Sequence, residues 1–368
     1  MKRLVFIGFI LLFGFNLLDA QSRRVSVYSE SSSPSDKKEF KNPPRTVELP
    51  KPANKKETDD GDVILVDTDL VVIPTQIYSR DGKVVAGLKK EEFKVFEDDV
   101  EQEVAYFSGD EQPFTVALVL DMSYSSIFKL EEIQAAAFTF INQLRPEDKV
   151  MVISFDEKAR VLCEPTNNRK VLRLAIEATK IQSGTSVYTA LDLALNQKLN
   201  QVSGRKAVVL LSDAVDTSSQ KLTAGDILEN IGDSDVLIYP IQYDTYDDVQ
   251  KTRKETAQVF YDDNDRPIVV EMPRKKGERE EDYKKANDFL NELANLTGGR
   301  VDKVSSTTNL NQAFARIANE LRKIYSLGFY PGDKKKVGVR YGLKVRVYRP
   351  NLLVRARNSY VWTRNRPQ

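Results

Sequence analysis

The sequence predicts an α/β protein with a doubly wound, mostly parallel sheet and a second, smaller β-rich domain. Between Phe114 and Tyr325, apolar strand-like segments alternate with amphipathic helical segments, which is the pattern of a parallel sheet covered on both faces. On either side of this region, the pattern changes to short alternating or β-branched stretches with turn signals between them. We therefore expect an α/β core flanked in sequence by two β segments.

The N-terminal residues have the three parts of a secretory signal. Met1-Lys2-Arg3 is basic, Leu4 to Leu18 is mostly apolar, and Ala20 is the small residue before the expected cleavage site. Residues 1–20 are thus predicted to be a signal peptide, with export to the periplasm, the cell envelope or the medium. The apolar run is short for a spanning helix, so no stable membrane span is expected after cleavage, and an uncleaved anchor is the alternative.

Residues 21–61 are predicted to form a disordered tether. The segment is rich in Ser, Pro, Lys and Asp and has too few apolar residues to bury. A short edge strand at Val47 to Leu49 is the alternative interpretation of its end.

Two β-rich segments, 62–110 and 326–368, are predicted to pack together as one small β-sandwich-like domain. Turn signals such as Arg80 to Lys83 and Pro331 to Asp333 separate their strand-like stretches. Neither segment alone holds enough apolar surface for its own core. The expected strands are Ile64–Pro74, Thr75–Tyr78, Phe93–Glu97, Glu103–Phe107, Leu327–Tyr330, Tyr341–Tyr348 and Leu352–Ala356.

The region 111–325 is predicted to contain the α/β core. Apolar residues recur at helical spacing from Leu130 to Leu144, and Gly298-Gly299 follows a helical pattern where a C-terminal cap is expected. The expected strands are Phe114–Leu120, Val150–Phe155, Ala159–Cys163, Ala207–Leu211 and Val236–Ile241, and the other expected helices are Val171–Thr179, Val187–Leu199, Tyr283–Leu296 and Leu310–Tyr325.

Oxygen-bearing side chains follow the first buried strand. Asp121, Ser123 and Ser125 alternate directly after Leu120. Because open α/β sheets bind ligands beyond the carboxyl ends of their strands, these side chains are candidate ligands for Mg²⁺, Ca²⁺ or Mn²⁺. A Ser-rich turn that caps the next helix is the alternative for this motif taken alone.

Two later segments favour the metal interpretation. Thr185 lies in the loop Ser183 to Ser186 before a helical pattern, and Asp213 follows the apolar strand Ala207 to Leu211. Three segments therefore follow one another: a strand that ends in D-x-S-x-S, a loop with Gly-Thr, and a strand that ends in Asp. This order resembles the metal-ion-dependent adhesion site (MIDAS) of von Willebrand factor type A (VWA) domains, whose core is a Rossmann-like sheet.

The resemblance implies one bound divalent cation, Mg²⁺ or else Ca²⁺ or Mn²⁺. By it, Ser123 and Ser125 would bind the ion directly, and Thr185 would bind it directly or through water depending on conformation. Asp121 and Asp213 would act largely through water. The family mechanism leaves one coordination position for a carboxylate supplied by a protein partner.

Two positions depart from the usual family pattern. Many members have Gly where Tyr124 and Ala214 stand in this chain. Tyr124 could crowd the rim of the site or become a contact residue, and Ala214 makes the backbone less free at its turn. All five ligand-type side chains are present, so the departures bear on the affinity of the site more than on its existence.

The order of segments also resembles the VWFA-related proteins of acidobacterial type. The resemblance rests on Asp81-Gly82, Phe96-Glu97-Asp98, the VWA core and the run Tyr325 to Pro331, and it covers nearly the whole chain after the tether. It implies an exported bacterial binding protein of unspecified ligand.

Composition excludes several classes of function. Histidine is absent and Cys163 is the only cysteine, which rules out His-dependent triads, zinc sites of Cys or His and an internal disulfide framework. The 55 Lys and Arg residues balance 54 Asp and Glu residues, so no nucleic-acid partner is expected. Cys163 lies in a strand-like segment, which favours a buried, inert thiol.

Residues 245–281 are predicted to be an insertion in the VWA domain. They are longer than ordinary strand-to-helix connections and leave the sheet on the face of the metal motif. Asp262 to Asp265 resembles the start of a calcium loop, but prolines stand where that loop requires Gly and Glu, so a hairpin is favoured. We expect the hairpin to border the site and to contribute to partner selection, whereas the charge run Arg274 to Glu281 is predicted to be a solvated loop, with a specific contact as the alternative.

The sequence thus predicts an exported, non-enzymatic VWA protein that binds a protein partner through a divalent cation. A structural envelope protein, in which the metal only stabilises the fold, is the first alternative. A metal-dependent hydrolase is the second, although the ligands themselves are the only candidates for a general base. In VWA domains of the integrin type, the last helix moves when ligand binds, so Leu310 to Tyr325 could pass such a movement to the β domain, with a rigid junction as the alternative.

Overall fold

The computed structural model describes residues 70–109, 112–124, 129–261, 266–270, 273–332 and 335–362 of the 368-residue chain. The predicted signal peptide, the tether with its alternative strand, and the residues Asp262 to Asp265 lie outside the described residues. Ser125 lies outside them too. No helix within the described ranges has the length and apolarity needed to cross a membrane.

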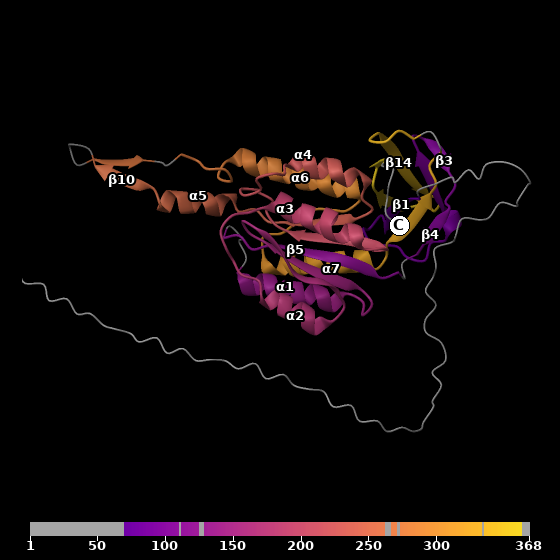
Figure 1. Cartoon of the computed structure of the whole chain (residues 1–368), viewed down its shortest axis with the longest axis horizontal. Helices are drawn as coiled ribbons and strands as arrows, with labels where there is room; N and C mark the ends of the chain where they lie inside the picture. Colours follow the sequence, from indigo (N-terminus) through magenta and orange to yellow (C-terminus); the bar gives the residue numbers. More distant parts are fainter. Residues whose placement is uncertain are drawn as a thin grey trace, which may run out of the picture. The chain divides into compact units, whose positions relative to one another are not determined.

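The helices and strands follow one another from β1 to β16 (Figure 1). Before the α/β region come β1 (Val71–Ser79), the 3-10 turn η1 (Lys90–Glu92), β2 (Phe93–Glu97), β3 (Val100–Gln102) and β4 (Tyr106–Ser108). The first half of the α/β region contains β5 (Phe114–Asp121), α1 (Leu130–Gln143), β6 (Lys149–Phe155), β7 (Ala159–Thr166), α2 (Arg169–Glu177), α3 (Val187–Asp192), η2 (Leu193–Lys198) and η3 (Leu199–Gln201).

The second half of the α/β region contains β8 (Arg205–Leu211), α4 (Ala224–Asn230), η4 (Ile231–Asp233), β9 (Leu237–Gln242), α5 (Tyr246–Glu255), β10 (Gln258–Tyr261), β11 (Pro267–Val270), α6 (Glu280–Thr297), β12 (Asp302–Lys303) and α7 (Thr307–Leu321). The chain then forms β13 (Tyr325–Phe329), β14 (Arg340–Val347), β15 (Leu352–Ala356) and β16 (Ser359–Val361).

A six-stranded sheet with the strand order β12-β9-β8-β5-β6-β7 is the centre of the α/β region. Its strands are parallel except for β7, which pairs antiparallel with β6. Both faces are apolar: in β5, Val116 and Leu118 pack with α1, α2 and α7, whereas Ala117 and Val119 pack with α3, α4 and α6 (Figure 1). The predicted doubly wound, mostly parallel sheet is confirmed.

Strands from before and after the core form the smaller domain together. One sheet has the order β15-β1-β13-β4 and the other has the order β16-β14-β2-β3, so each sheet mixes both terminal segments. The side chains between them form one apolar cluster, in which the rings of Phe93 and Tyr325 lie 5.0 Å apart. The predicted β-sandwich-like domain built from two segments is confirmed.

Arg205, at the start of β8, joins the two places where the chain crosses between the core and the β domain. Its guanidinium donates hydrogen bonds to the carbonyl oxygens of Gly109 and Ile324, and to that of Gln112 at 3.3 Å. Its Nε donates to the hydroxyl of Ser326 at 3.3 Å. The segments that lead into β5 and out of α7 are therefore held by one side chain.

Several elements differ from their expected bounds. The last helix, expected to reach Tyr325, ends at Leu321, because Tyr325 turns into the β domain and starts β13. The helix expected at 187–199 is α-helical only to Asp192 and continues as the π-helical η2 and the 3-10 turn η3. Residues 71–78, expected to be divided between two strands, lie in one continuous strand, β1.

Two helices were not predicted because their sequences carry little apolar pattern. Helix α4 buries Ile227 alone, and α5 buries none of its residues. The expected hairpin after α5 is present as β10 and β11, which pair antiparallel. The thiol of Cys163 is half-buried rather than buried, since it lies on the edge strand β7, and its pKa is raised by that burial.

Candidate metal centre

The ends of β5 and β8 bring two carboxylates to one edge of the sheet. β5 ends at Asp121, and Asp213 follows β8 after one residue. The two strands pair in parallel register, with Leu120 opposite Leu211, so the residues that follow them emerge side by side. The exposed fractions of Asp121 and Asp213 are 0% and 3%.

The Asp121 carboxylate is held by its own loop and by the end of β8. Its Oδ1 accepts a hydrogen bond from the backbone N–H of Ser123 at 3.0 Å. Its Oδ2 accepts one from the hydroxyl of Ser212 at 2.5 Å, and that hydroxyl accepts in turn from the N–H of Ala214 at 2.9 Å. Neutral donors thus fix the side chain.

The Asp213 carboxylate is held by its own loop and by the segment that follows β9. Its Oδ1 accepts from the N–H of Val215 at 3.0 Å, and its Oδ2 accepts from the hydroxyl of Thr245 at 2.7 Å. The Thr245 hydroxyl also lies 2.9 Å from the hydroxyl of Tyr283 on α6. Sequence reasoning missed Thr245, although its place after an apolar strand at the same sheet edge was an available signal.

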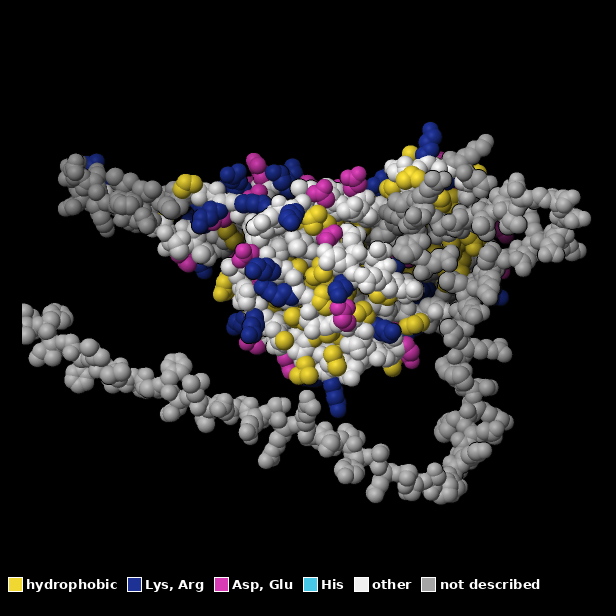
Figure 2. All heavy atoms as spheres, viewed as in Figure 1, with side chains coloured by type: hydrophobic (Ala, Val, Ile, Leu, Met, Phe, Trp, Pro, Cys, Tyr) yellow, Lys and Arg dark blue, Asp and Glu magenta, His cyan; other side chains and the backbone are white. Residues whose placement is uncertain are grey.

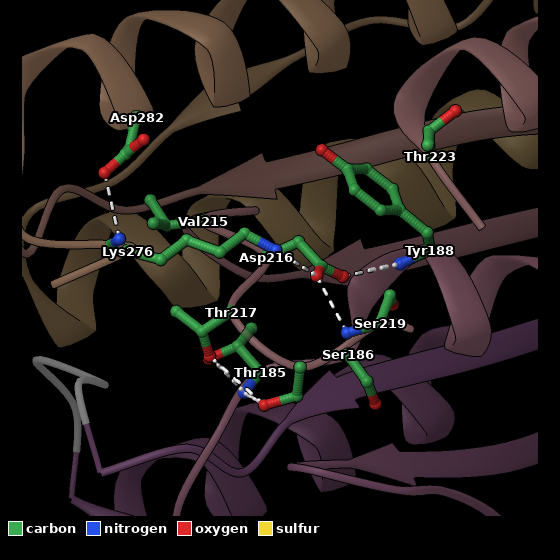
Figure 3. A network of polar contacts seen from close by, with 12 residues as sticks. Thr185, Ser186, Tyr188, Val215, Asp216, Thr217, Ser219, Thr223, Lys276 and Asp282 are labelled. Atoms are coloured by element: carbon green, nitrogen blue, oxygen red, sulfur yellow. Dashed lines mark hydrogen bonds and ion pairs between the residues drawn. The ribbon is translucent and has the colours of Figure 1, made fainter. Parts of the chain in front are cut away.

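The loop with Thr185 is clamped between the two Asp motifs. On one side, Tyr124 donates its N–H to the carbonyl of Gln182 at 3.0 Å, and Gln182 donates to Met122 at 2.8 Å. On the other side, the N–H of Thr185 donates to the hydroxyl of Thr217 at 3.0 Å, and the N–H of Thr217 donates to the carbonyl of Thr185 at 2.9 Å (Figure 3). Thr185 is therefore positioned by backbone contacts from both motifs.

Gly184 is required by this clamp. Its φ of 80° is in the left-handed region, which favours glycine. A Cβ atom at this position would lie 2.5 Å from the hydroxyl oxygen of Ser218 and 3.1 Å from Cβ of Glu157. The close approach of the loop to both neighbours explains why the residue before Thr185 has no side chain.

The two buried carboxylates repel each other. Burial raises the pKa of Asp213 to about 7, and the nearby charge of Asp121 adds to the increase. Burial also raises the pKa of Asp121, while hydrogen bonds from Ser212 and Ser123 oppose that rise. In the described part of the chain no Lys or Arg forms a salt bridge with either one.

The donor set fits a hard divalent cation. Two carboxylates and the hydroxyls of Ser123 and Thr185 are oxygen donors, the ligands that Mg²⁺, Ca²⁺ and Mn²⁺ prefer. Within the described ranges there is no group of three or more His, Cys, Asp or Glu side chains that could hold a metal ion. A site here would therefore depend on hydroxyl ligands as well as on carboxylates.

Four of the five predicted site residues lie at this edge of the sheet: Asp121, Ser123, Thr185 and Asp213, while the fifth, Ser125, is not among the described residues. The two departures also have clear places. Tyr124 is 74% exposed, so it extends into solvent rather than into the site. Ala214 has a φ of 59°, a conformation that costs a residue with a Cβ atom about 1 kcal/mol.

A family model for the von Willebrand factor type A domain matches residues 116–215, which include all five predicted site residues. This part of the chain is a VWA domain. The predicted resemblance to VWA proteins is thereby confirmed. A curated relative, the uncharacterized protein sll0103 of Synechocystis sp., is 31% identical over 105 residues, which is 27% of this chain and 25% of that protein. The matched part thus spans only a quarter of the relative's length.

Solved structures that match this chain include one von Willebrand factor type A protein and two proteins with other names. The von Willebrand factor type A protein from Catenulispora acidiphila is 13% identical with a TM-score of 0.43, covering 81% of this chain and 74% of that one. An aerotolerance-related membrane protein from Bacteroides fragilis is 17% identical with a TM-score of 0.38, covering 56% and 98%. Proximal thread matrix protein 1 from the mussel byssus, solved with zinc in its MIDAS motif, is 13% identical with a TM-score of 0.42, covering 62% and 50%.

Proposed function

We propose that this VWA domain binds one divalent cation and, through it, a carboxylate of a protein partner, without catalysing a reaction. The observation that carries the proposal is the pair Asp121 and Asp213, two buried carboxylates that neutral donors position and that no described Lys or Arg neutralises. Burying an acid without a counter-charge is costly, so a cation from solvent is the natural partner of such a pair.

Each residue has a separate task in this proposal. Ser123, Thr185 and, by resemblance, Ser125 would hold the ion, with Asp121 and Asp213 behind them. When bound, the cation supplies a positive charge for the carboxylate of the partner. Mg²⁺ is the proposed ion, and the same oxygen donors suit Ca²⁺ or Mn²⁺.

The cellular setting is also a proposal. The N-terminal segment supports export to the periplasm, the cell envelope or the medium, where a protein partner rather than a nucleic acid would be met. The near-neutral balance of 55 basic and 54 acidic residues gives no reason to expect nucleic acid.

A purely structural ion is the second candidate, and one observation favours it. The four described site residues are at most 3% exposed, which is the environment of an ion that only stabilises the sheet edge. The two candidates differ in one measurable respect. Removing a structural ion would lower the stability of the protein only, whereas removing an ion that binds the partner would also abolish partner binding.

Calorimetric titration with Mg²⁺, Mn²⁺ and Ca²⁺ tests the ion site. We expect Asp121→Asn to weaken binding of the best ion at least about tenfold, because it removes one of two anionic groups from a small site. The matched control is Asp288→Asn, which removes an exposed carboxylate on α6. Equal affinity in wild type and Asp121→Asn would sink the assignment.

A pull-down from envelope extract separates the two candidates. With wild-type protein, we expect a partner to be retained in Mg²⁺ and released by EDTA, and Asp121→Asn to retain none. If EDTA lowers the melting temperature but leaves the retained proteins unchanged, the structural ion is the better description.

A further inference from the structure

The two ends of the insertion at 245–281 contact Asp213 and the loop that follows it, residues 214–219, which we call the site loop. At the first end, Thr245 donates its hydroxyl to the Asp213 carboxylate at 2.7 Å. At the second end, the backbone of Gly277 packs so closely that a Cβ atom there would lie 2.7 Å from Cγ2 of Thr217 and 3.4 Å from Cγ1 of Val215. In the described residues, the contacts with the site thus come from the ends of the insertion. The sequence had led us to expect them from its hairpin.

Contacts within the insertion fix the position of the second end. Arg253 on α5 forms an ion pair with Glu278, and both side chains are partly buried. Gln250 donates to the carbonyl of Glu278 at 2.8 Å, and the N–H of Gly277 donates to the carboxylate of Asp282 at 2.9 Å. The segment before α6 therefore has a defined place beside the site loop.

Three consecutive basic residues stand at this place: Arg274, Lys275 and Lys276, which we call the basic segment. All three are exposed. The Lys276 ammonium lies 3.5 Å from Oδ1 of Asp216, next to the residue that bonds to Thr185 (Figure 3). The ammonium is therefore close to the loops that carry the candidate metal ligands.

Acidic residues follow the basic segment at positions 278 and 280–282, but no ion pair in the described residues joins them to it. No ion pair of Arg274 or Lys275 occurs in the described part of the chain, and Glu278 is already paired with Arg253. Asp216 already accepts hydrogen bonds from the N–H groups of Ser219 and Tyr188, so its pair with Lys276 is not exclusive (Figure 3). Figure 2 shows Lys and Arg side chains over α5 and the start of α6, with acidic side chains among them.

We infer that the basic segment selects acidic protein segments as partners of the VWA domain. The inference rests on the proposed function, because the partner carboxylate on the ion would place its neighbouring residues near residues 274–276. Exposed charges interact over about 8 Å at physiological ionic strength, so acidic residues beside that carboxylate would be attracted and basic ones repelled. The ion would bind the partner carboxylate, and the basic segment would favour partners with acidic residues beside that carboxylate.

Two synthetic peptides test the inference by fluorescence anisotropy. Each has one central Asp, flanked by Glu residues in one peptide and by Gln residues in the other. In Mg²⁺, we expect the wild-type protein to bind the Glu-flanked peptide at least about fivefold more tightly, with a preference that shrinks as NaCl is added. Equal affinity for the two peptides would overturn the inference and leave the metal proposal standing.

Substitution of the basic segment gives the matched comparison. The double change Arg274→Gln and Lys275→Gln should weaken binding of the Glu-flanked peptide about fivefold and leave the Gln-flanked peptide unchanged. The control is Lys149→Gln with Lys170→Gln, which removes two exposed charges from the start of β6 and from α2. A preference for Glu flanks that survives in the first variant would refute the role of the basic segment.

An EDTA arm separates failure of the inference from failure of the proposed function. If the Glu-flanked peptide binds equally in Mg²⁺ and EDTA but is lost in the Arg274→Gln and Lys275→Gln variant, the basic segment binds acids and the metal-bridged carboxylate is wrong. If neither peptide binds the wild-type protein in any condition, both proposals are contradicted.

Discussion

Two groups of buried acidic side chains in the VWA core have different surroundings. Near α7, Arg300 contacts Glu320 at 2.9 Å and Asp302 at 3.1 Å, and Arg316 contacts Asp302 at 2.7 Å. At the ends of β5 and β8, by contrast, Asp121 and Asp213 have hydroxyl and N–H donors and repel each other.

On our proposal, the first group of acids serves the fold and the second group serves a ligand. A buried carboxylate needs a counter-charge, and near α7 the chain supplies guanidinium groups. Burial raises the pKa of Glu320, and the charge of Arg300 opposes that rise. Near Asp121 and Asp213 the described residues supply no such group, and this excess of negative charge is what favours a cation there.

The largest expected effect comes from breaking the compensated region. Arg300→Met would leave Asp302 and Glu320 short of a positive charge in a buried place, and we expect the free energy of unfolding to fall by about 3–5 kcal/mol. Urea denaturation measures it. Lys284→Met, an exposed change on α6, should stay within about 0.5 kcal/mol of wild type. A loss below about 1 kcal/mol for Arg300→Met would contradict the view that Asp302 and Glu320 need the charge of Arg300.

The same kind of change should have the opposite sign at the candidate metal centre. In EDTA at about pH 8, Asp213→Asn removes one of two repelling charges and should raise the free energy of unfolding by about 1–3 kcal/mol. In Mg²⁺ we expect wild type to be the more stable protein, because the variant binds the ion poorly. A variant that is less stable than wild type in EDTA would argue against repulsion between Asp121 and Asp213.

The pH dependence of stability and of ion binding tests the same repulsion between Asp121 and Asp213. The pKa of Asp213 is raised from its ordinary value of about 4 to about 7 in the metal-free protein, so the folded state keeps a proton that the unfolded state loses. The stability of the metal-free protein is then expected to fall as pH rises from about 4 to about 7. Because the ion competes with that proton, Mg²⁺ affinity should decrease below about pH 7, by up to tenfold per pH unit. Titration calorimetry across this pH range measures the Mg²⁺ affinity, and an affinity that does not change with pH would contradict the prediction.

The fold and the place of the site follow from local patterns that sequence alone reveals. Strand β5 is apolar at every position from Val116 to Leu120 because both of its faces are buried, and such a run identifies a central parallel strand. The polar residues that follow β5 and β8 then lie at one sheet edge by topology alone. The order of strands along the chain is therefore enough to predict that Asp121 and Asp213 lie close together.

Partners that depend on tertiary contacts could not be predicted in this way. The place of Thr245 after an apolar strand indicates the sheet edge but not its hydrogen bond to Asp213, 32 residues earlier in the chain. Helix α5 buries none of its residues, so no apolar period marks that helix. The end of α7 was misplaced for the opposite reason: Ile324 packs in the core and Tyr325 in the β domain, so the apolar pattern continues past the helix. Apolar spacing shows that a residue is buried but not which core buries it.

The pairing of β1 with β13 sets an order of assembly on the growing chain. Val71 pairs with Phe329, so β1 finds this partner only after the whole VWA core has been made, whereas β2 can pair with the neighbouring β3 early and gains its second partner, β14, late. The core can close as a unit during that interval, since its sheet draws every strand from residues 114–303. Until then Ile73 and Ile77 on β1 have no cover, and capture by a chaperone or mispairing with another nascent copy competes with closure of the β domain.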